Sequence, residues 1–123
     1  MPIAPLLRCT DLDATRRHYR DVLQFTVTDT TQSTLTVQLR DCSLLFTEQD
    51  LWRLPPGCAG TFYLVVEDVD SYYAQVRELA DIAWPLHDTE YGSREFGVRD
   101  CNGYYLAFSQ RHGDAVQAAR VAL

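Results

Sequence analysis

The chain has 123 residues, 46% of them apolar, which suffices for one small domain or two closely packed half-domains. Its net charge is −6 and it contains no lysine, so we expect no nucleic-acid partner, because phosphate binding needs clustered basic side chains. No apolar run approaches the roughly 18 residues of a membrane-spanning helix, and we therefore expect no membrane partner.

Residues 1–5 lack the basic and apolar regions of a secretory signal. The four cysteines lie at positions 9, 42, 58 and 101 and form no Cys-x-x-Cys pair. Such cysteines are more often free thiols than disulfides or metal ligands. Both observations favour a cytoplasmic location.

The first half of the chain predicts one helix and four strands. Residues 3–10 alternate as in a strand, and Asp11 and Asp13 offer N-cap oxygens to a helix over 13–23. Threonine and valine favour strands over 25–30, 34–39 and 44–47. The segment 48–60 contains Pro55, Pro56 and Gly57 and predicts a loop.

The second half predicts the same order. A strand over 61–67 precedes a helix over 69–80, and three strands follow near 81–86, 94–99 and 104–109. The alanine-rich tail, residues 111–123, predicts a short helix. The predicted order is therefore βαβββ twice.

The sequence also repeats itself. The tripeptide Arg-Asp-Cys occurs at 40–42 and again at 99–101, an offset of 59 residues. The segment 6–13, an apolar stretch followed by acidic residues, resembles the segment 63–70, an offset of 57 residues. A repeat of this kind indicates two copies of one supersecondary unit. We predict an α+β fold with one βαβββ module over 1–50, a linker over 51–60, a second module over 61–110 and a tail over 111–123.

Two segments carry a resemblance to a known family. Residues 11–14 (DLDA) with 18–25 (HYRDVLQF), and residues 91–104 (YGSREFGVRDCNGY), resemble the opening and closing segments of the vicinal oxygen chelate superfamily, in its glyoxalase/bleomycin resistance branch. The resemblance spans about residues 4 to 110. It implies two modules that form cup-shaped mixed sheets, and a homodimer in which the N-terminal strand around Pro5 is exchanged. Gln24 stands where the family usually has glycine, so we expect a positive φ there.

The resemblance also implies where a divalent metal would be bound. Counting from Asp11, Asp68 and Gly103, and aligning the first copy on the second, places the family's four ligand positions here at Ala4, Phe46, Thr61 and Ala107. Alanine and phenylalanine have no donor atom, and a threonine hydroxyl is a poor neutral ligand. We therefore expect no metal and no other cofactor.

Family enzymes depend on this metal, so its loss favours binding over catalysis. The sequence predicts a metal-independent protein that sequesters a planar or cationic, antibiotic-like ligand in a groove at a dimer interface. Strand alternation and aromatic character select the candidate ligand-binding residues Tyr63, Phe46, Trp52, Trp84, Tyr105, Tyr91, Arg8 and Glu48. Arg94 and Glu95 are expected to form structural cross-strand pairs.

Two alternatives stay open. One is a metal-dependent lyase or dioxygenase of the same superfamily with a divergent site that uses Glu48, His87 or Glu90. The other is a dimerisation or regulatory module whose cup is filled by Phe46 and Tyr105.

Overall fold

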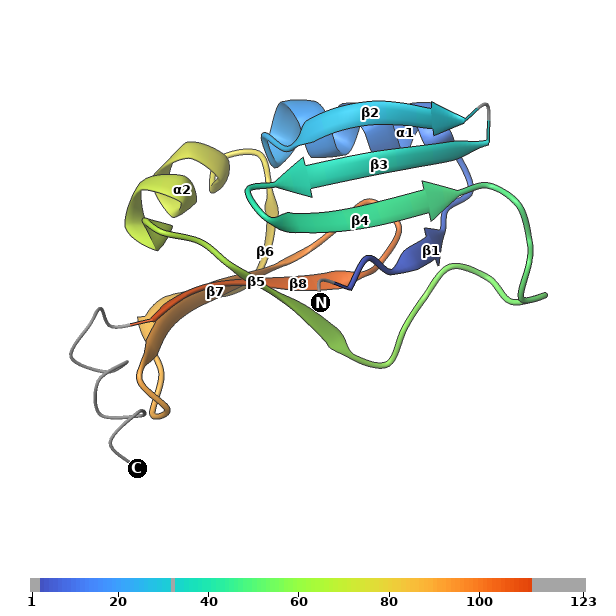
Figure 1. Cartoon of the computed structure of the whole chain (residues 1–123). Helices are drawn as coiled ribbons and strands as arrows, with labels where there is room; N and C mark the ends of the chain where they lie inside the picture. Colours follow the sequence, from blue (N-terminus) through green and yellow to red (C-terminus); the bar gives the residue numbers. More distant parts are fainter. Residues whose placement is uncertain (1–2, 32, 112–123) are drawn as a thin grey trace.

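The computed structural model describes residues 3–31 and 33–111, and its elements follow the βαβββ order twice (Figure 1). The first module contains β1 (Leu6–Arg8), α1 (Leu12–Arg17), the π-helical turn η1 (His18–Val22), β2 (Thr26–Thr31), β3 (Thr34–Leu39) and β4 (Cys42–Thr47). The second contains β5 (Thr61–Val65), α2 (Val69–Val76), β6 (Asp81–Asp88), β7 (Ser93–Arg99) and β8 (Tyr105–Arg111). The tail helix expected from the sequence lies outside the described residues, except that Arg111 belongs to β8.

Each module forms a four-stranded mixed sheet. The strand orders are β1-β4-β3-β2 and β5-β8-β7-β6, with the first and last strands of each module parallel and the other pairs antiparallel. Figure 1 shows the first sheet face-on with α1 behind it, and the second sheet nearly edge-on below. The predicted α+β class and tandem modules are confirmed.

Both helices begin in the same way. Asp11 Oδ1 accepts the Ala14 amide at 3.0 Å, and Asp68 Oδ1 accepts the Ser71 amide at 3.1 Å, so both predicted N-caps are present. Gln24 has φ of 62°, which confirms the positive φ expected at this position. The next residue, Phe25, is buried in the core.

The core lies between the two modules, where the helices and the inner faces of both sheets meet. Tyr19, Phe46, Phe96 and Phe108 are fully buried, and Phe25 of the first module contacts Phe108 of the second with ring centroids 6.2 Å apart. We use "outer face" for the opposite side of each sheet, which neither α1 nor α2 covers (Figure 1). In the described part of the chain, no helix is long and apolar enough to cross a membrane.

Candidate ligand-binding face

The outer face of the second sheet carries a row of residues that crosses all four strands. Trp84 pairs with Gly97, Gly97 with Ala107, and Ala107 with Tyr63. Paired residues in neighbouring strands point to the same side of a sheet, so these four form one continuous line. The two outer strands contribute the aromatic rings, and the two central strands contribute almost no side chain. The row therefore carries its bulk at its two ends, and Ala107 between them is fully buried.

The Trp84 indole packs directly on Gly97. A Cβ atom at Gly97 would lie 2.2 Å from Trp84 Cε2 and 2.4 Å from Cζ2, so the ring lies directly on the glycine backbone. The indole plane is also within 10° of the Tyr105 ring, with centroids 6.5 Å apart. Trp84 and Tyr105 thus present a nearly parallel pair of aromatic surfaces on this face.

A buried carboxylate lies in the next row of the same face. Glu95 pairs with Ser109 on β8, and it is only 3% exposed. Its Oε2 accepts the indole Nε1–H of Trp84 at 3.2 Å, and its Oε1 accepts the hydroxyl of Tyr91. Both donors are neutral, and among the described residues no basic side chain lies within ion-pair distance of Glu95. Glu95 is therefore a buried negative charge held by two aromatic side chains.

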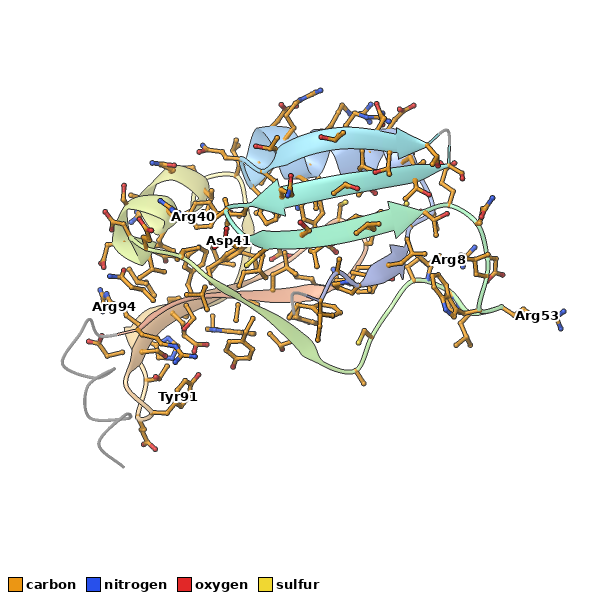
Figure 2. All side chains as sticks on the ribbon, in the orientation of Figure 1. Arg8, Arg40, Asp41, Arg53, Tyr91 and Arg94 are labelled. Atoms are coloured by element: carbon orange, nitrogen blue, oxygen red, sulfur yellow. The ribbon has the colours of Figure 1, made fainter. Side chains whose placement is uncertain are left out.

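Tyr91 covers Glu95 from the turn between β6 and β7 (Figure 2). Hydrogen bonding to Glu95, and then to Tyr63, raises the pKa of the Tyr91 hydroxyl far above its ordinary value, so it stays protonated and donates. The Tyr91 side chain is 58% exposed. Beside it lies a hollow of about 220 Å³, whose lining residues are Tyr63, Val65, Tyr91, Gly92, Ser93, Ser109 and Arg111.

Four predicted site residues therefore come together on this face: Tyr63, Trp84, Tyr91 and Tyr105. Tyr63 is 57% exposed and Tyr105 37% exposed, so neither ring is consumed by the protein's own core. Tyr105 is therefore not buried within the described chain, as a residue that fills the predicted cup would be.

Phe46 was expected on the same kind of surface, and that expectation is wrong. Phe46 is fully buried on the inner face of the first sheet, against Tyr19 and Tyr104. The reason is the length of the two equivalent turns. Leu39 pairs with Cys42 across a two-residue turn, whereas Arg99 pairs with Tyr105 across a five-residue turn. The turns differ by three residues, so aligning the two Asp-Cys phrases shifts β4 by an odd number of residues relative to β8 and assigns Phe46 to the wrong face.

Glu48 was also expected to contact ligand, but the structure gives its carboxylate another role. Glu48 Oε2 accepts the Leu12 amide at 2.8 Å, at the start of α1. Gln110 Oε1 accepts the Val69 amide at 2.8 Å, at the equivalent place in the second module. Glu48 is thus a structural contact to a helix N-terminus.

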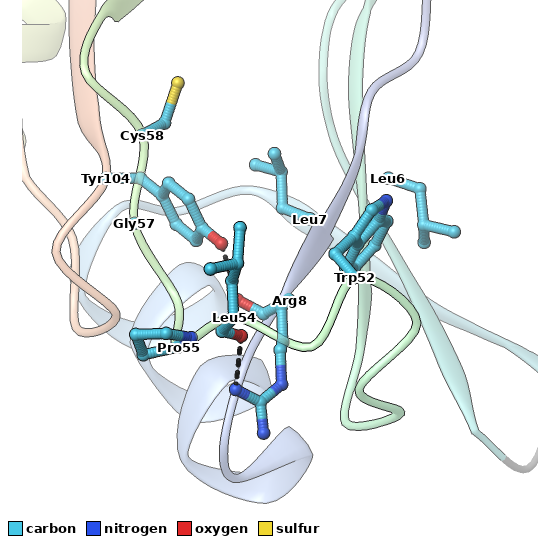
Figure 3. A pocket seen from close by; sticks show the side chains of 9 residues that line it. All are labelled: Leu6, Leu7, Arg8, Trp52, Leu54, Pro55, Gly57, Cys58 and Tyr104. Atoms are coloured by element: carbon cyan, nitrogen blue, oxygen red, sulfur yellow. Dashed lines mark hydrogen bonds between the residues drawn. The ribbon is translucent and has the colours of Figure 1, made fainter.

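Arg8 and Trp52 lie in a separate hollow of about 230 Å³, between β1 and the loop that joins the modules (Figure 3). Arg8 Nη1 donates to the Leu54 carbonyl oxygen at 2.7 Å, and its Nε lies 3.8 Å from Asp50. Trp52 is 45% exposed on the same loop. The structure therefore does not bring these two residues to the aromatic face of the second sheet.

The metal positions implied by the resemblance can now be placed by strand pairing. Leu6 pairs with Leu45, as Tyr63 pairs with Ala107, so Leu45 and not Phe46 is the equivalent of Ala107. The corrected set is Ala4, Leu45, Thr61 and Ala107, which still offers no carboxylate, imidazole or thiolate to a divalent ion. Residues 3–31 and 33–111 also contain no cluster of three or more histidine, cysteine, aspartate or glutamate side chains suited to a metal. The family's metal does not fit these residues.

The residues of the open enzyme alternative are not assembled either. Glu48 contacts α1, His87 is exposed on β6 with its Nδ1 2.8 Å from the Pro85 carbonyl oxygen, and Glu90 is exposed in the next turn.

Sequence reasoning missed Glu95 and Gly97. Arg94 forms a cross-strand ion pair with Asp88 at 3.3 Å and a second ion pair with Asp70 at 3.1 Å, and Glu95 accepts a cross-strand hydrogen bond from Trp84. One signal was present in the sequence. A glycine inside a strand marks close approach of another group, and Gly97 lies two residues from Glu95 on β7.

These features define a class of protein: a tandem βαβββ fold that carries an open aromatic face with a buried acid. The model of the Glyoxalase/Bleomycin resistance protein/Dioxygenase superfamily matches residues 3–108. The chain therefore belongs to this superfamily.

Solved structures share this fold. A glyoxalase/bleomycin resistance protein/dioxygenase from Alicyclobacillus acidocaldarius is 17% identical, with a TM-score of 0.74 over 94% of this chain and 95% of the other. TioX from Micromonospora sp. ML1 is 21% identical, with a TM-score of 0.74 over 90% and 98%. The bleomycin-binding protein of bleomycin-producing Streptomyces verticillus, solved with copper(II)-bleomycin, is 20% identical, with a TM-score of 0.66 over 88% and 93%. At these identities the likeness concerns the fold, and no curated protein sequence matches the chain.

Proposed function

We propose that this protein binds a planar small molecule on the outer face of its second sheet and does so without a metal. The observation that carries the proposal is the row from Trp84 to Tyr63, whose aromatic ends flank the small residues Gly97 and Ala107. Planar ligands are held by such aromatic surfaces together with a few polar groups. The metal positions of the family hold no suitable ligands, so binding is favoured over metal-dependent chemistry.

A second copy of the chain would complete the groove. Several large apolar side chains on or beside the outer faces are exposed in the single chain: Ile3 (87%), Leu6 (38%), Tyr63 (57%) and Val65 (53%). Apolar surface of this kind marks interaction sites. In the single chain β1 pairs with β4 of the same chain, so exchange of the N-terminal strand around Pro5 stays a prediction. Light scattering should give twice the 14.1 kDa of the chain.

The biological role that we propose is sequestration of an antibiotic-like molecule in the cytoplasm. The bleomycin complex of the Streptomyces verticillus protein shows that this fold can hold such a compound, and it makes bleomycin and phleomycin the first compounds to test. Sequestration needs only affinity, and the face described above offers stacking surface and a fixed charge.

The test is a thermal-shift and calorimetric titration with bleomycin, phleomycin and a panel of divalent metals. Saturable binding of an antibiotic is expected to raise the melting temperature, because a ligand at 100 times its Kd adds about 2.7 kcal/mol of stability. Tyr63→Ala should weaken binding by about 1–3 kcal/mol, the scale of a lost stacking contact, whereas Tyr63→Phe keeps the ring and should bind nearly as well. A shift with metal alone would instead support the enzyme alternative.

A further inference from the structure

We infer that Glu95 is the charge-recognising group of this face, and that the ligand it selects carries a cationic nitrogen next to its planar ring. The inference rests on the proposed function and specifies the chemistry of its ligand. It follows from the burial of Glu95, the nature of its two partners and the electrostatics of the rings around it.

Glu95 is a buried carboxylate without a basic partner among the described residues. An ionised carboxylate that is 3% exposed normally needs a cationic partner, because burial removes its hydration. Here it receives one hydrogen bond from an indole and one from a phenol. A carboxylate has about four acceptor positions, so Glu95 can accept more than these two donors supply.

The position of Glu95 makes it available to a ligand on the aromatic row. Glu95 and Gly97 lie two residues apart on β7 and point to the same face, so the carboxylate lies one row from the glycine on which Trp84 packs. The Trp84 indole spans the two rows, because it lies on Gly97 and donates to Glu95. A ring stacked on Trp84 would therefore place its edge beside Glu95.

Tyr91 is the part of the cover that a ligand can replace. Its side chain is 58% exposed and comes from a turn, whereas the Trp84 indole lies on the Gly97 backbone, beside and nearly parallel to the Tyr105 ring. An N–H⁺ group that takes the place of the Tyr91 hydroxyl would turn a neutral hydrogen bond into a charge-assisted one, which is about twice as strong. Displacement of Tyr91 would also open the neighbouring 220 Å³ hollow toward Glu95.

The surrounding rings favour the same sign of charge. The faces of Trp84, Tyr105, Tyr63 and Tyr91 carry negative quadrupole density, which attracts cations and adds to the field of Glu95. The basic residue of the adjoining hollow, Arg111, pairs across the sheet with Ser93, one row beyond Glu95, and is exposed. A neutral ring would gain the stacking energy alone.

The experiment compares two probes of nearly the same shape: 9-aminoacridine, which is cationic at pH 8 and carries N–H donors, and acridine, which is uncharged at that pH. Affinities are measured by quenching of the Trp84 emission in a Trp52→Phe background, since the chain has two tryptophans. We expect the protein to bind the cation roughly tenfold or more tightly than acridine. Glu95→Gln should abolish this preference, because it weakens binding of the cation and leaves the affinity for acridine unchanged. Glu78→Gln, at an exposed residue next to Arg77, removes the same charge elsewhere and should keep the preference.

The outcomes separate the two claims. If neither probe nor the antibiotics bind, the proposed function fails. If both probes bind equally, or if the preference survives in Glu95→Gln, the function stands and the inference is overturned. Should Glu95→Gln not fold, Tyr91→Phe decides the matter. Removal of the competing hydroxyl should tighten cation binding several-fold, whereas a purely structural Tyr91–Glu95 contact predicts equal or weaker binding.

Discussion

Substitution of Gly97 by alanine is expected to displace Trp84 from the outer face of the second sheet. The new Cβ would lie 2.2–2.5 Å from three indole atoms, whereas ordinary contact begins at 3.4 Å, so the ring must retreat by about 1.2 Å. The Trp84 Nε1–Glu95 Oε2 hydrogen bond is already 3.2 Å long and would not survive this movement. One added methyl group should therefore remove both the stacking surface and one of the two partners of Glu95.

The expected cost in free energy of unfolding is about 1–3 kcal/mol. Overpacking costs roughly this amount, and loss of a donor to a buried carboxylate costs about the same. The two costs do not add in full, because the partly exposed indole can move outward and water can reach the carboxylate. Alanine also restricts the unfolded chain and recovers about 0.4–1 kcal/mol, which keeps the net value in that range. For a chain of this size each kcal/mol lowers the melting temperature by roughly 3–6 °C.

Chemical denaturation and tryptophan emission measure the effect, with Gly60→Ala as control. A Cβ at Gly60 would meet only Cys58 Sγ at 3.8 Å, so this variant should be as stable as the native protein or slightly more so. In a Trp84→Ala background the Gly97→Ala substitution should cost nothing, because the clash is gone. If Gly97→Ala alone keeps native stability and native Trp84 emission, the indole does not lie on the glycine and the reasoning is refuted.

Two further predictions concern stability. Gln24→Gly should raise the free energy of unfolding by about 0.5–1 kcal/mol. Gln24 is exposed and has φ of 62°, a conformation that costs an L-residue about 1–2 kcal/mol, and the greater freedom of glycine in the unfolded chain offsets part of this gain. Equal or lower stability in urea titration would contradict this. Burial lowers the pKa of His18 below the ordinary value of 6.5 for histidine. Between that value and the pKa in the folded protein, the unfolded state binds more protons than the folded state. The free energy of unfolding therefore falls as the pH drops through this window. His18→Gln should flatten that part of the stability profile, and an unchanged slope would show that another group is responsible.

The fold could be predicted because its signals are local. Asp11 and Asp68 lie directly before the helices, and their side chains accept the expected amides. The positive φ at Gln24 was also predictable, since it follows from the family's glycine at that position. Strand alternation selected Tyr63 as a candidate; β5 does alternate and Tyr63 is exposed, while ligand contact at Tyr63 stays a prediction.

The site was harder because it depends on strand register. On β6, Trp84 pairs with Gly97 and His87 with Glu95, so three residues of β6 span two residues of β7. Such a bulge breaks the period of two on which face assignments depend. The donors to Glu95 also come from separate segments, and no local pattern joins Trp84, Tyr91 and Glu95. The misplacement of Phe46 has the same origin, since equivalent turns differ in length.

Comparison of equivalent rows in the two modules explains why binding is proposed for the second sheet and not the first. The row Trp84–Gly97–Ala107–Tyr63 corresponds in the first sheet to Thr28–Thr36–Leu45–Leu6. The two backbone frames pair in the same way, so the difference lies in the side chains. The first row holds two threonines and two leucines, whereas the second concentrates aromatic rings at its ends, with the Trp84 indole lying on Gly97.

The next row of each sheet differs in charge. It contains Arg8 in the first sheet and Glu95 in the second, in the sets Arg8–Thr47–Thr34 and Val65–Ser109–Glu95. In the proposed dimer these outer faces would line one groove, and an arginine facing Glu95 would neutralise it. Arg8 is instead bound by the Leu54 carbonyl oxygen at 2.7 Å and lies 3.8 Å from Asp50. Because the linker loop holds this guanidinium, the proposed dimer would leave Glu95 to a cationic ligand.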